Sequence, residues 1–240
     1  MIKLPTEQEL TRAIAAFLNR NYLPLKDLGN EIPALFEMAG LNLVIDLYDK
    51  MGYETVPANL QNGEYHYKLQ PNGLKYNFSW FDVSRSYYGK VQEYEIHENL
   101  AVQVAGTEDC FLHPDVAVVK KDTAEKLPNS GILVHQKEYW YVKNKNLKTF
   151  LEAKYLRPFP ELLLNFPGML MALRPNNKNY SRIKRGPKHV APIFMLAGTA
   201  NGHSGRISKF LTEKYHVNLV FGSMKISKTK MKGVKKITLS

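Results

Sequence analysis

The strongest restriction on the fold comes from the order in which helical and extended patterns follow one another. The 240-residue chain opens with a helical pattern at about 7–20, where Thr6 and Glu9 are spaced as a capping box. A second helix is predicted at about 33–51, with a proline near its start and a glycine after its end. Strands, a helix, a strand, a helix and a short strand follow. This order predicts a mixed α/β fold with a central β-sheet flanked by helices.

Two β-hairpins are predicted as insertions in this fold. The stretches "EYHYKLQ" and "LKYNFSWFDV" flank "PNG" at 71–73, where Gly73 can adopt a positive φ. The stretch "YWYVKNKNLKTFLEAKY" at 139–155 has the pattern of a second hairpin. Further strands are expected at 91–105, 113–121, 190–198 and 217–221, and further helices at 160–173 and 203–215.

The length suits one large domain with short additions. We expect an N-terminal helical segment at 1–32, an α/β domain at 33–222 and a basic C-terminal tail at 223–240. The most apolar run, 13 residues at 161–173, is shorter than the roughly 20 residues that a membrane helix needs. It predicts a buried helix and no membrane partner.

The cellular compartment is expected to be the cytoplasm. Cys110 is the only cysteine, which excludes an internal disulfide and a cysteine zinc site and is typical of a reducing compartment. The first ten residues, "MIKLPTEQEL", are too polar for a signal peptide.

Positive charge is concentrated in the last part of the chain. The formal net charge is +11, yet residues 1–173 contain 18 basic and 21 acidic residues. Residues 174–240 contain 15 basic residues and a single acid, Glu213. Such asymmetry favours a polyanion partner, above all nucleic acid, although a solvated tail is the alternative. The expected nucleic-acid contacts are Arg182, Lys184, Arg185, Lys188 and Arg206.

One strand carries charges within an apolar pattern. In "TFLEAKYLRP", at 149–158, the strand period of two places Phe150, Glu152 and Lys154 on one face and Ala153 on the other. Charged side chains are seldom buried without a partner or a chemical role. A cross-strand ion pair on an exposed face would also explain the acid and the lysine.

A second acid begins another apolar strand. In "HPDVAVV", Pro114 suits a strand start and is followed by Asp115. If this strand lies beside the one with Glu152, the two carboxylates can converge, because neighbouring strands are about 4.8 Å apart. Two carboxylates at that separation suit Mg²⁺, and Lys154 would lie about 7 Å along from Glu152. A strand-end role in capping a turn is the alternative for Asp115.

The pair Pro114-Asp115 and the triplet Glu152-Ala153-Lys154, each within an apolar strand, resemble the motif of the PD-(D/E)xK nuclease superfamily. The resemblance spans about 33–222 and implies a restriction-endonuclease-like fold. The family often has a glutamate on the preceding helix, and Glu37 in "LFEMAGLNLVIDLYDKMGYETV" matches it. An ordinary helix acid is the alternative reading of Glu37. The gap of 36 residues between Asp115 and Glu152 requires an insert that contains 122–143.

The resemblance implies a site and a chemistry. Asp115, Glu152, the carbonyl of Ala153 and, directly or through water, Glu37 would hold Mg²⁺, for which Mn²⁺ should substitute. Lys154 would orient the attacking water and stabilise the transition state. The expected activity is metal-dependent hydrolysis of phosphodiester bonds by an endonuclease, with DNA as the expected substrate.

Two other functions share part of this pattern. A non-catalytic nucleic-acid-binding subunit with a degenerate nuclease fold would need the basic third of the chain but no convergent acids. An RNase would need both. A homodimer, or a partner protein in a larger nucleic-acid-processing complex, is compatible with either, as are roles in phage defence, restriction or transposition.

Overall fold

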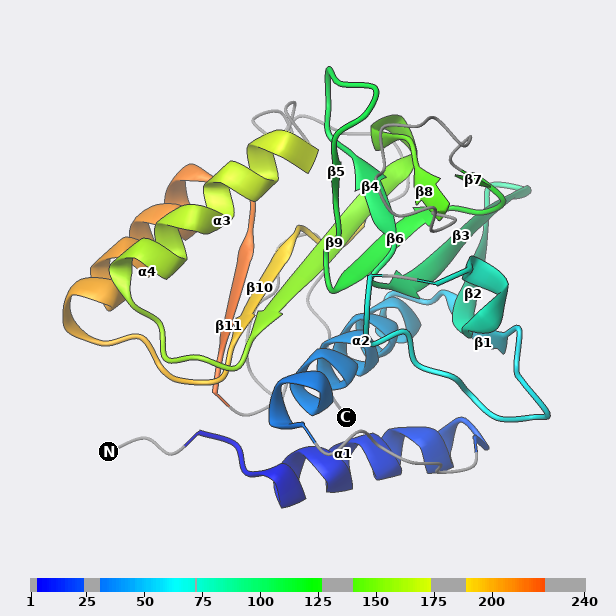
Figure 1. Cartoon of the computed structure of the whole chain (residues 1–240), viewed down its shortest axis with the longest axis horizontal. Coiled ribbons are helices and arrows are strands. Elements are labelled where there is room, and N and C mark those ends of the chain that lie inside the picture. The colour runs from blue at the N-terminus through cyan, green and yellow to red at the C-terminus, as the bar shows by residue number, and fades with distance from the viewer. Residues whose placement is uncertain (1–3, 24–30, 72, 127–139, 174–188, 223–240) are drawn as a thin grey trace.

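The computed structural model describes residues 4–23, 31–71, 73–126, 140–173 and 189–222 (Figure 1). The predicted basic tail, 223–240, lies outside the described residues, and so do the predicted nucleic-acid contacts Arg182, Lys184, Arg185 and Lys188.

Helices and strands alternate along the chain as the sequence predicts. The α-helices are α1 (Glu7–Arg20), α2 (Ile32–Lys50), α3 (Pro160–Leu173) and α4 (Gly202–Lys214), and the 3₁₀ helices are η1 (Lys75–Asn77) and η2 (Asn144–Asn146). The main sheet has seven strands in the order β1 (Glu54–Ala58), β2 (Trp80–Tyr87), β3 (Lys90–Glu98), β6 (Val116–Lys120), β9 (Leu147–Lys154), β10 (Ile193–Leu196) and β11 (Asn218–Phe221). A smaller sheet has the order β5 (Phe111–Leu112), β4 (Ala101–Gln103), β8 (Trp140–Val142) and β7 (Ala124–Lys126).

The main sheet is mixed in direction. Strands β1, β2, β3, β6 and β9 pair antiparallel, whereas β9, β10 and β11 pair parallel. Parallel neighbours need a crossover connection, and α3 and α4 fall in the two connections between these strands. The predicted mixed α/β fold with flanking helices is confirmed. None of the described helices combines the length and apolar character needed to cross a membrane.

Helices cover both faces of the main sheet, so its strands are apolar on both sides (Figure 1). Leu151 and Ala153 of β9 belong to the apolar cluster that contains α1 and α2. Phe150 belongs to the cluster with α3 and lies against Phe166, with ring centroids 5.9 Å apart. The period of two along β9 thus separates two hydrophobic cores, as the sequence pattern predicts.

Helix α1 begins with the predicted capping box. The Glu9 backbone N–H donates to Thr6 Oγ1, and the Glu9 carboxylate accepts from the Thr6 backbone N–H. The helix packs against α2 within one apolar cluster. Residues 1–32, predicted as a separate segment, therefore include a helix that shares its core with α2.

Helix α2 lies very close to β9. A Cβ atom added to Gly40 would be 2.8 Å from Leu151 Cδ2, which is closer than unbonded carbon atoms pack. Glycine therefore permits this approach. Because Glu37 lies one turn before Gly40, the same approach brings its side chain towards the end of β9 that carries Glu152.

Both predicted hairpins are wrong. Among the described residues of 64–79 there is no strand, apart from an isolated bridge between Gln61 and Glu64 at the edge of this stretch. Strand β2 starts at Trp80 and pairs with β3 instead. Gly73 does have a positive φ of 104°, but the buried Tyr65 packs against Phe81 of β2, with ring centroids 5.2 Å apart. Burial of these aromatic rings outweighed the local turn signal.

Two of the predicted segments each contribute one strand to the main sheet and one strand to the smaller sheet. They are 139–155 and 91–105. Strand β8 joins the smaller sheet, and β9 joins the main sheet next to β6. Strand β3 ends before Asn99, whose φ of 46° interrupts the extended chain, and β4 belongs to the smaller sheet. The predicted insert at 122–143 contains β7 and β8, which both belong to the smaller sheet.

Candidate active site

The two acids predicted to converge lie on neighbouring strands. Strand β6 begins directly after Asp115 and pairs antiparallel with β9, with Val116 opposite Leu151. This register brings Asp115 to the level of Glu152. The sequence interpretation depended on the condition that these two strands are neighbours, and the structure meets that condition.

Lysine 154 connects the two carboxylates. Its Nζ atom lies 2.6 Å from Glu152 Oε1 and 3.4 Å from Asp115 Oδ2. The backbone N–H of Ala153 donates a 2.6 Å hydrogen bond to the same Asp115 oxygen. The Asp115 side chain is thereby held against the β9 backbone. The single ammonium group of Lys154 forms ion pairs with both acids.

Helix α2 supplies a third acid. The half-buried Glu37 interacts electrostatically with Asp115, Glu152 and Lys154. Burial, and then the negative charge of Asp115, raise the pKa of Glu37 to about 7. The four predicted catalytic side chains therefore interact with one another, although they come from α2, from β9 and from the residue before β6.

Negative charge exceeds positive charge at this site. Burial, and then the charge of Asp115, raise the pKa of Glu152 to about 7. Burial likewise raises the pKa of Asp115. Burial alone would lower the pKa of Lys154, but the charges of Asp115 and Glu152 outweigh it and raise that pKa. Lysine 154 remains a cation, and it does not fully compensate the acids around it.

A fourth acid, Glu98, was not predicted from the sequence. It ends β3, is 3% exposed, and accepts a 3.1 Å hydrogen bond from the backbone N–H of Lys68. Burial raises its pKa well above the usual range, and the charges of Glu37 and Asp115 raise it further. We refer to Glu37, Glu98, Asp115, Glu152 and Lys154 as the acid cluster.

The sequence did contain a signal for Glu98. With a period of two, Glu98 falls on the same face of β3 as Tyr94 and Ile96, which are buried against α2. An acid at an inward-facing position of a strand requires an explanation, as Glu152 does. The signal was missed because 91–105 was predicted as one continuous strand.

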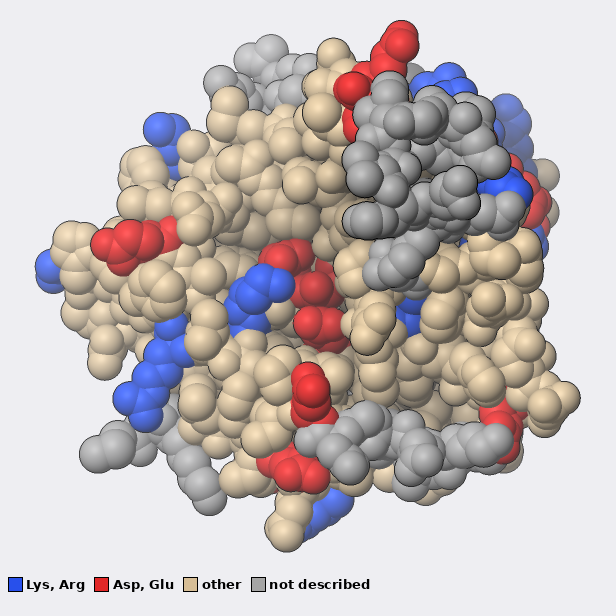
Figure 2. Space-filling model, viewed as in Figure 1, with Lys and Arg blue, Asp and Glu red and all other residues tan. Residues whose placement is uncertain are grey.

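Two carboxylate oxygens of the acid cluster lack a hydrogen-bond donor. These buried atoms are Glu152 Oε2 and Glu98 Oε1. Buried polar atoms are normally paired, so these two oxygens are available to a further donor or a cation. Figure 2 shows acidic side chains gathered in the middle of one face of the molecule, next to a basic side chain.

The donor set fits a hard divalent cation. Carboxylate and carbonyl oxygens are the ligands that Mg²⁺ prefers, and Mg²⁺ keeps several waters when one or two carboxylates hold it. In the part of the chain that the structure describes, no group of three or more acidic, histidine or cysteine side chains is arranged so that it could hold a metal ion, so at most two side chains would act as ligands together. Asp115, Glu152 and the Ala153 carbonyl would supply the protein ligands, with Glu37 close by.

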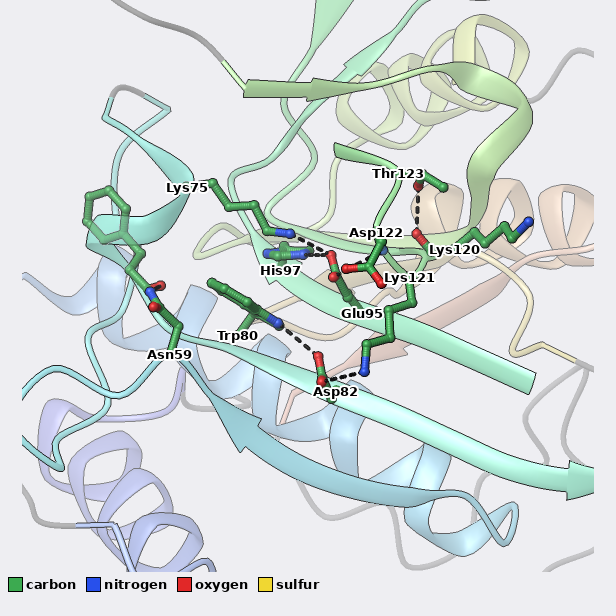
Figure 3. A network of polar contacts seen from close by, with 11 residues as sticks. Asn59, Lys75, Trp80, Asp82, Glu95, His97, Lys120, Lys121, Asp122 and Thr123 are labelled. Atoms are coloured by element: carbon green, nitrogen blue, oxygen red, sulfur yellow. Dashed lines mark hydrogen bonds and ion pairs between the residues drawn. The ribbon is translucent and has the colours of Figure 1, made fainter. Parts of the chain in front are cut away.

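A second buried polar region lies elsewhere on the sheet, on β2 and β3 (Figure 3). Glu95 Oε2 accepts from Lys75 Nζ at 2.9 Å and lies 2.7 Å from His97 Nε2, and its Oε1 accepts from the Asp122 backbone N–H at 3.3 Å. Burial would raise the pKa of Glu95, but His97 and Lys75 outweigh it and lower that pKa to about 2.

The neighbouring acid of this region is paired in the same way. Asp82 Oδ1 accepts from Trp80 Nε1 and Asp82 Oδ2 from Lys121 Nζ, each at 2.9 Å. Lys75 Nζ also lies 4.5 Å from the centre of the Trp80 ring. We call this set the Glu95 network, and it consists of Lys75, Trp80, Asp82, Glu95, His97 and Lys121.

The predicted nucleic-acid contacts are only partly described. Arg206 lies on α4 and is exposed. It is the one predicted contact within the described ranges, and it is not part of the acid cluster. Comparison of the chain with family models, with curated proteins and with solved structures found no match.

Proposed function

We propose that the protein is a metal-dependent endonuclease that hydrolyses phosphodiester bonds in DNA. The observation that carries the proposal is the meeting of Asp115 and Glu152 on neighbouring strands, bridged by Lys154. The order of a helix with Glu37, a strand after Pro114-Asp115 and a strand with Glu152-Ala153-Lys154 also agrees with a restriction-endonuclease-like fold.

The excess of acid favours this proposal over a structural ion pair. Lys121 also pairs with two acids, Asp82 and Glu93, but both of these carboxylates are partly exposed to water, with 32% and 52% of the side chain accessible. In the acid cluster one lysine faces several carboxylates, and the pKa of both Glu37 and Glu152 is raised to about 7. Such an arrangement costs folding stability unless a cation compensates it. Perturbed carboxylates of this kind are typical of functional sites.

Each side chain has a role that its position permits. Asp115 and Glu152 would hold Mg²⁺, which lowers the pKa of a bound water and offsets charge on the phosphate when it is present. Lys154 lies between the two acids and can donate to that water or to a phosphate oxygen. Its side chain is about one-third exposed, so a substrate can reach it.

Binding of nucleic acid is assigned to the basic third of the chain. Residues 174–240 carry 15 basic residues and one acid, and long-range attraction of phosphates needs such an excess. A non-catalytic binding subunit would share this charge, but it would gain nothing from destabilising acids that converge. We therefore favour the enzyme, acting alone, as a homodimer or within a larger complex.

The test is cleavage of supercoiled plasmid by the purified protein with Mg²⁺ or Mn²⁺. We expect nicking that EDTA abolishes, and the Asp115→Ala protein, purified in parallel, excludes a contaminating nuclease. A parallel reaction with single-stranded RNA separates an RNase from a DNase. Binding of DNA with no cleavage under any of these conditions would identify a binding subunit and refute the proposal.

A further inference from the structure

We infer that the end of the β2–β3 hairpin, residues 85–92, is a further contact surface for duplex DNA, an inference that rests on the proposed function. Strand β1 pairs with β2 only as far as Ser84, and β6 pairs with β3 only from Tyr94 onwards. Three further rungs of the hairpin, which pair residues 85–87 with 90–92, continue beyond both neighbouring strands. The two strands therefore extend past the sheet as a ribbon, which we call the β2–β3 ribbon.

Arg85 fixes the base of this ribbon. Its Nη1 atom donates a 2.9 Å hydrogen bond to the Met51 carbonyl oxygen, and its guanidinium carbon lies 5.5 Å from the centre of the Tyr53 ring. The tip lies far from the acid cluster, because Lys90 and Glu98 are the first and last residues of β3. At about 3.4 Å per strand residue the two are roughly 27 Å apart, so a change at the tip does not act through the acids.

The turn at the tip places an aromatic residue where it reduces stability. Tyr88 and Gly89 have φ values of 49° and 73°, and two positive φ angles are typical of a type I′ hairpin turn. Asparagine or aspartate is usual at the first of these positions, because a bulky side chain is strained there. Yet Tyr88 is 89% exposed, and Val91 is 67% exposed. Packing within the described chain therefore does not offset the strain, and an exposed residue of this kind indicates a role outside the fold.

The chemistry of the ribbon fits a groove of DNA. The major groove is wide enough to admit a two-stranded β-ribbon. Residues 85–92 contain two basic residues and no acid, within a part of the chain, 1–173, in which acids outnumber basic residues. The exposed Lys90 can donate to a phosphate, the Tyr88 hydroxyl to a base edge or a phosphate, and Val91 can contact a thymine methyl group. This combination of charge and shape favours DNA over a protein partner.

Tyr22 provides a matched control for Tyr88. It is 96% exposed and has a φ of 55°, so it shares the exposure and the backbone conformation of Tyr88. It follows the C-cap of α1, however, and is not part of a ribbon. Asparagine favours a positive φ at both positions, so Tyr22→Asn and Tyr88→Asn should each be at least as stable as wild type in thermal melts. The pair separates a contact made by the ribbon from the general effect of losing an exposed ring.

The experiment measures binding of a labelled duplex of plasmid sequence by fluorescence anisotropy, in EDTA to prevent metal-dependent cleavage. We expect Tyr88→Asn to weaken binding about tenfold, at the lower end of what one direct contact to a base pair contributes, and Tyr22→Asn to leave it unchanged. Lys90→Gln should make the slope of log affinity against log salt shallower by about 1 unit, because one phosphate contact is lost.

Three results would overturn the inference. They are wild-type affinity in Tyr88→Asn, an equal loss of affinity in Tyr22→Asn, and an unchanged salt slope in Lys90→Gln. Normal DNA binding by a Tyr88→Asn protein that no longer self-associates in sedimentation velocity would instead assign the ribbon to contact between two copies of the chain.

The fate of the proposed function is read separately from the wild-type protein. Cleavage by wild type that Asp115→Ala abolishes leaves the proposed function intact, whatever the ribbon variants do. Wild-type protein that binds duplex DNA without cleaving it would refute the proposed function, while the affinities of the ribbon variants still decide this inference. Wild-type protein that does not bind duplex DNA would refute both.

Discussion

The acid cluster and the Glu95 network are both buried polar regions on one sheet, and they differ in how completely their charges are paired. In the network, both oxygens of Glu95 and both oxygens of Asp82 accept hydrogen bonds (Figure 3). In the acid cluster, Glu152 Oε2 and Glu98 Oε1 have no donor. The pKa of Glu95 is lowered to about 2, whereas that of Glu152 is raised to about 7.

We infer from this difference a structural role for the Glu95 network, and the acid cluster fits the proposed catalytic role. A satisfied network holds its segments together and has no need of a further ligand. A cluster with surplus negative charge reduces folding stability until a cation binds. Position on a sheet and burial do not distinguish the two regions, but the balance of donors and acceptors does.

The largest expected effect is the loss of cleavage on removal of either strand acid. Asp115→Ala and Glu152→Ala should each reduce single-turnover cleavage by at least about a hundredfold, because each removes a group that stabilises charge at the reacting centre. Glu93→Ala, which removes an exposed carboxylate near Lys121, should cleave normally. Wild-type rates in either active-site variant, with an unchanged melting curve, would remove that acid from the site.

The next effect compares the lysines of the two regions. Lys154→Arg should be nearly as inactive as Lys154→Ala, because a planar guanidinium displaces the water that a compact ammonium can orient. Lys121→Arg should keep full activity, because Lys121 only pairs with Asp82 and Glu93. Single-turnover cleavage at saturating Mg²⁺ measures both. Near-wild-type cleavage by Lys154→Arg would assign Lys154 to a simple ion pair.

The Glu95 network should contribute to stability rather than to activity. Glu95→Ala leaves Lys75 and His97 without their buried anion, and we expect a loss of about 3 kcal/mol in the free energy of unfolding. Urea denaturation monitored by circular dichroism measures the loss, and activity per folded molecule should be unchanged. A variant that is fully stable yet inactive would place the network in the functional site.

The contributions of the two regions to folding stability should also depend on pH in opposite ways. The pKa of Glu152 is raised from 4.5 to about 7 in the folded protein, so its ionisation destabilises the fold as pH rises through this range. Glu152→Gln should therefore be more stable than wild type at pH 8, by about 3 kcal/mol, and equally stable at pH 4.

Glu95→Gln, the matching variant in the Glu95 network, should show the reverse dependence of folding stability on pH. The lowered pKa of Glu95 means that its contribution to stability is complete above about pH 4.5 and is lost as pH falls towards 2. Urea denaturation in EDTA at several pH values tests both statements. A Glu152→Gln variant less stable than wild type at pH 8 would show that the acid cluster is already compensated.

Local patterns predicted most elements of the fold. The capping box of α1, the apolar helix α3 and the strand after Pro114 lie where predicted, because each combines a terminal signal with a clear period. The turn signal at 71–73 misled the prediction. Tyr65 instead packs against Phe81 of the main sheet. A short turn motif contains no information about a contact with a residue so far along the chain.

For the candidate site, the sequence identified four of the five residues of the acid cluster, but it did not show how they come together in space. The period of β9 separated Glu152 and Lys154 from Ala153, and the proline before Asp115 marked a strand start. Glu37 entered only through a family resemblance. Glu98 was missed, since its significance depends on the end of β3 at Asn99, where the chain leaves the main sheet.

By itself, the sequence determined the order of elements, the two apolar faces of β9, the concentration of basic residues after 173 and the identity of two strand acids. These depend on periodicity and composition, which are local properties. Only the tertiary structure decided that β6 is the neighbour of β9, that Gly40 allows α2 to approach, and that Glu98 joins the cluster. Strand pairing and helix packing are chosen by burial across the whole chain, so the balance of charges at the site emerges only when the segments meet.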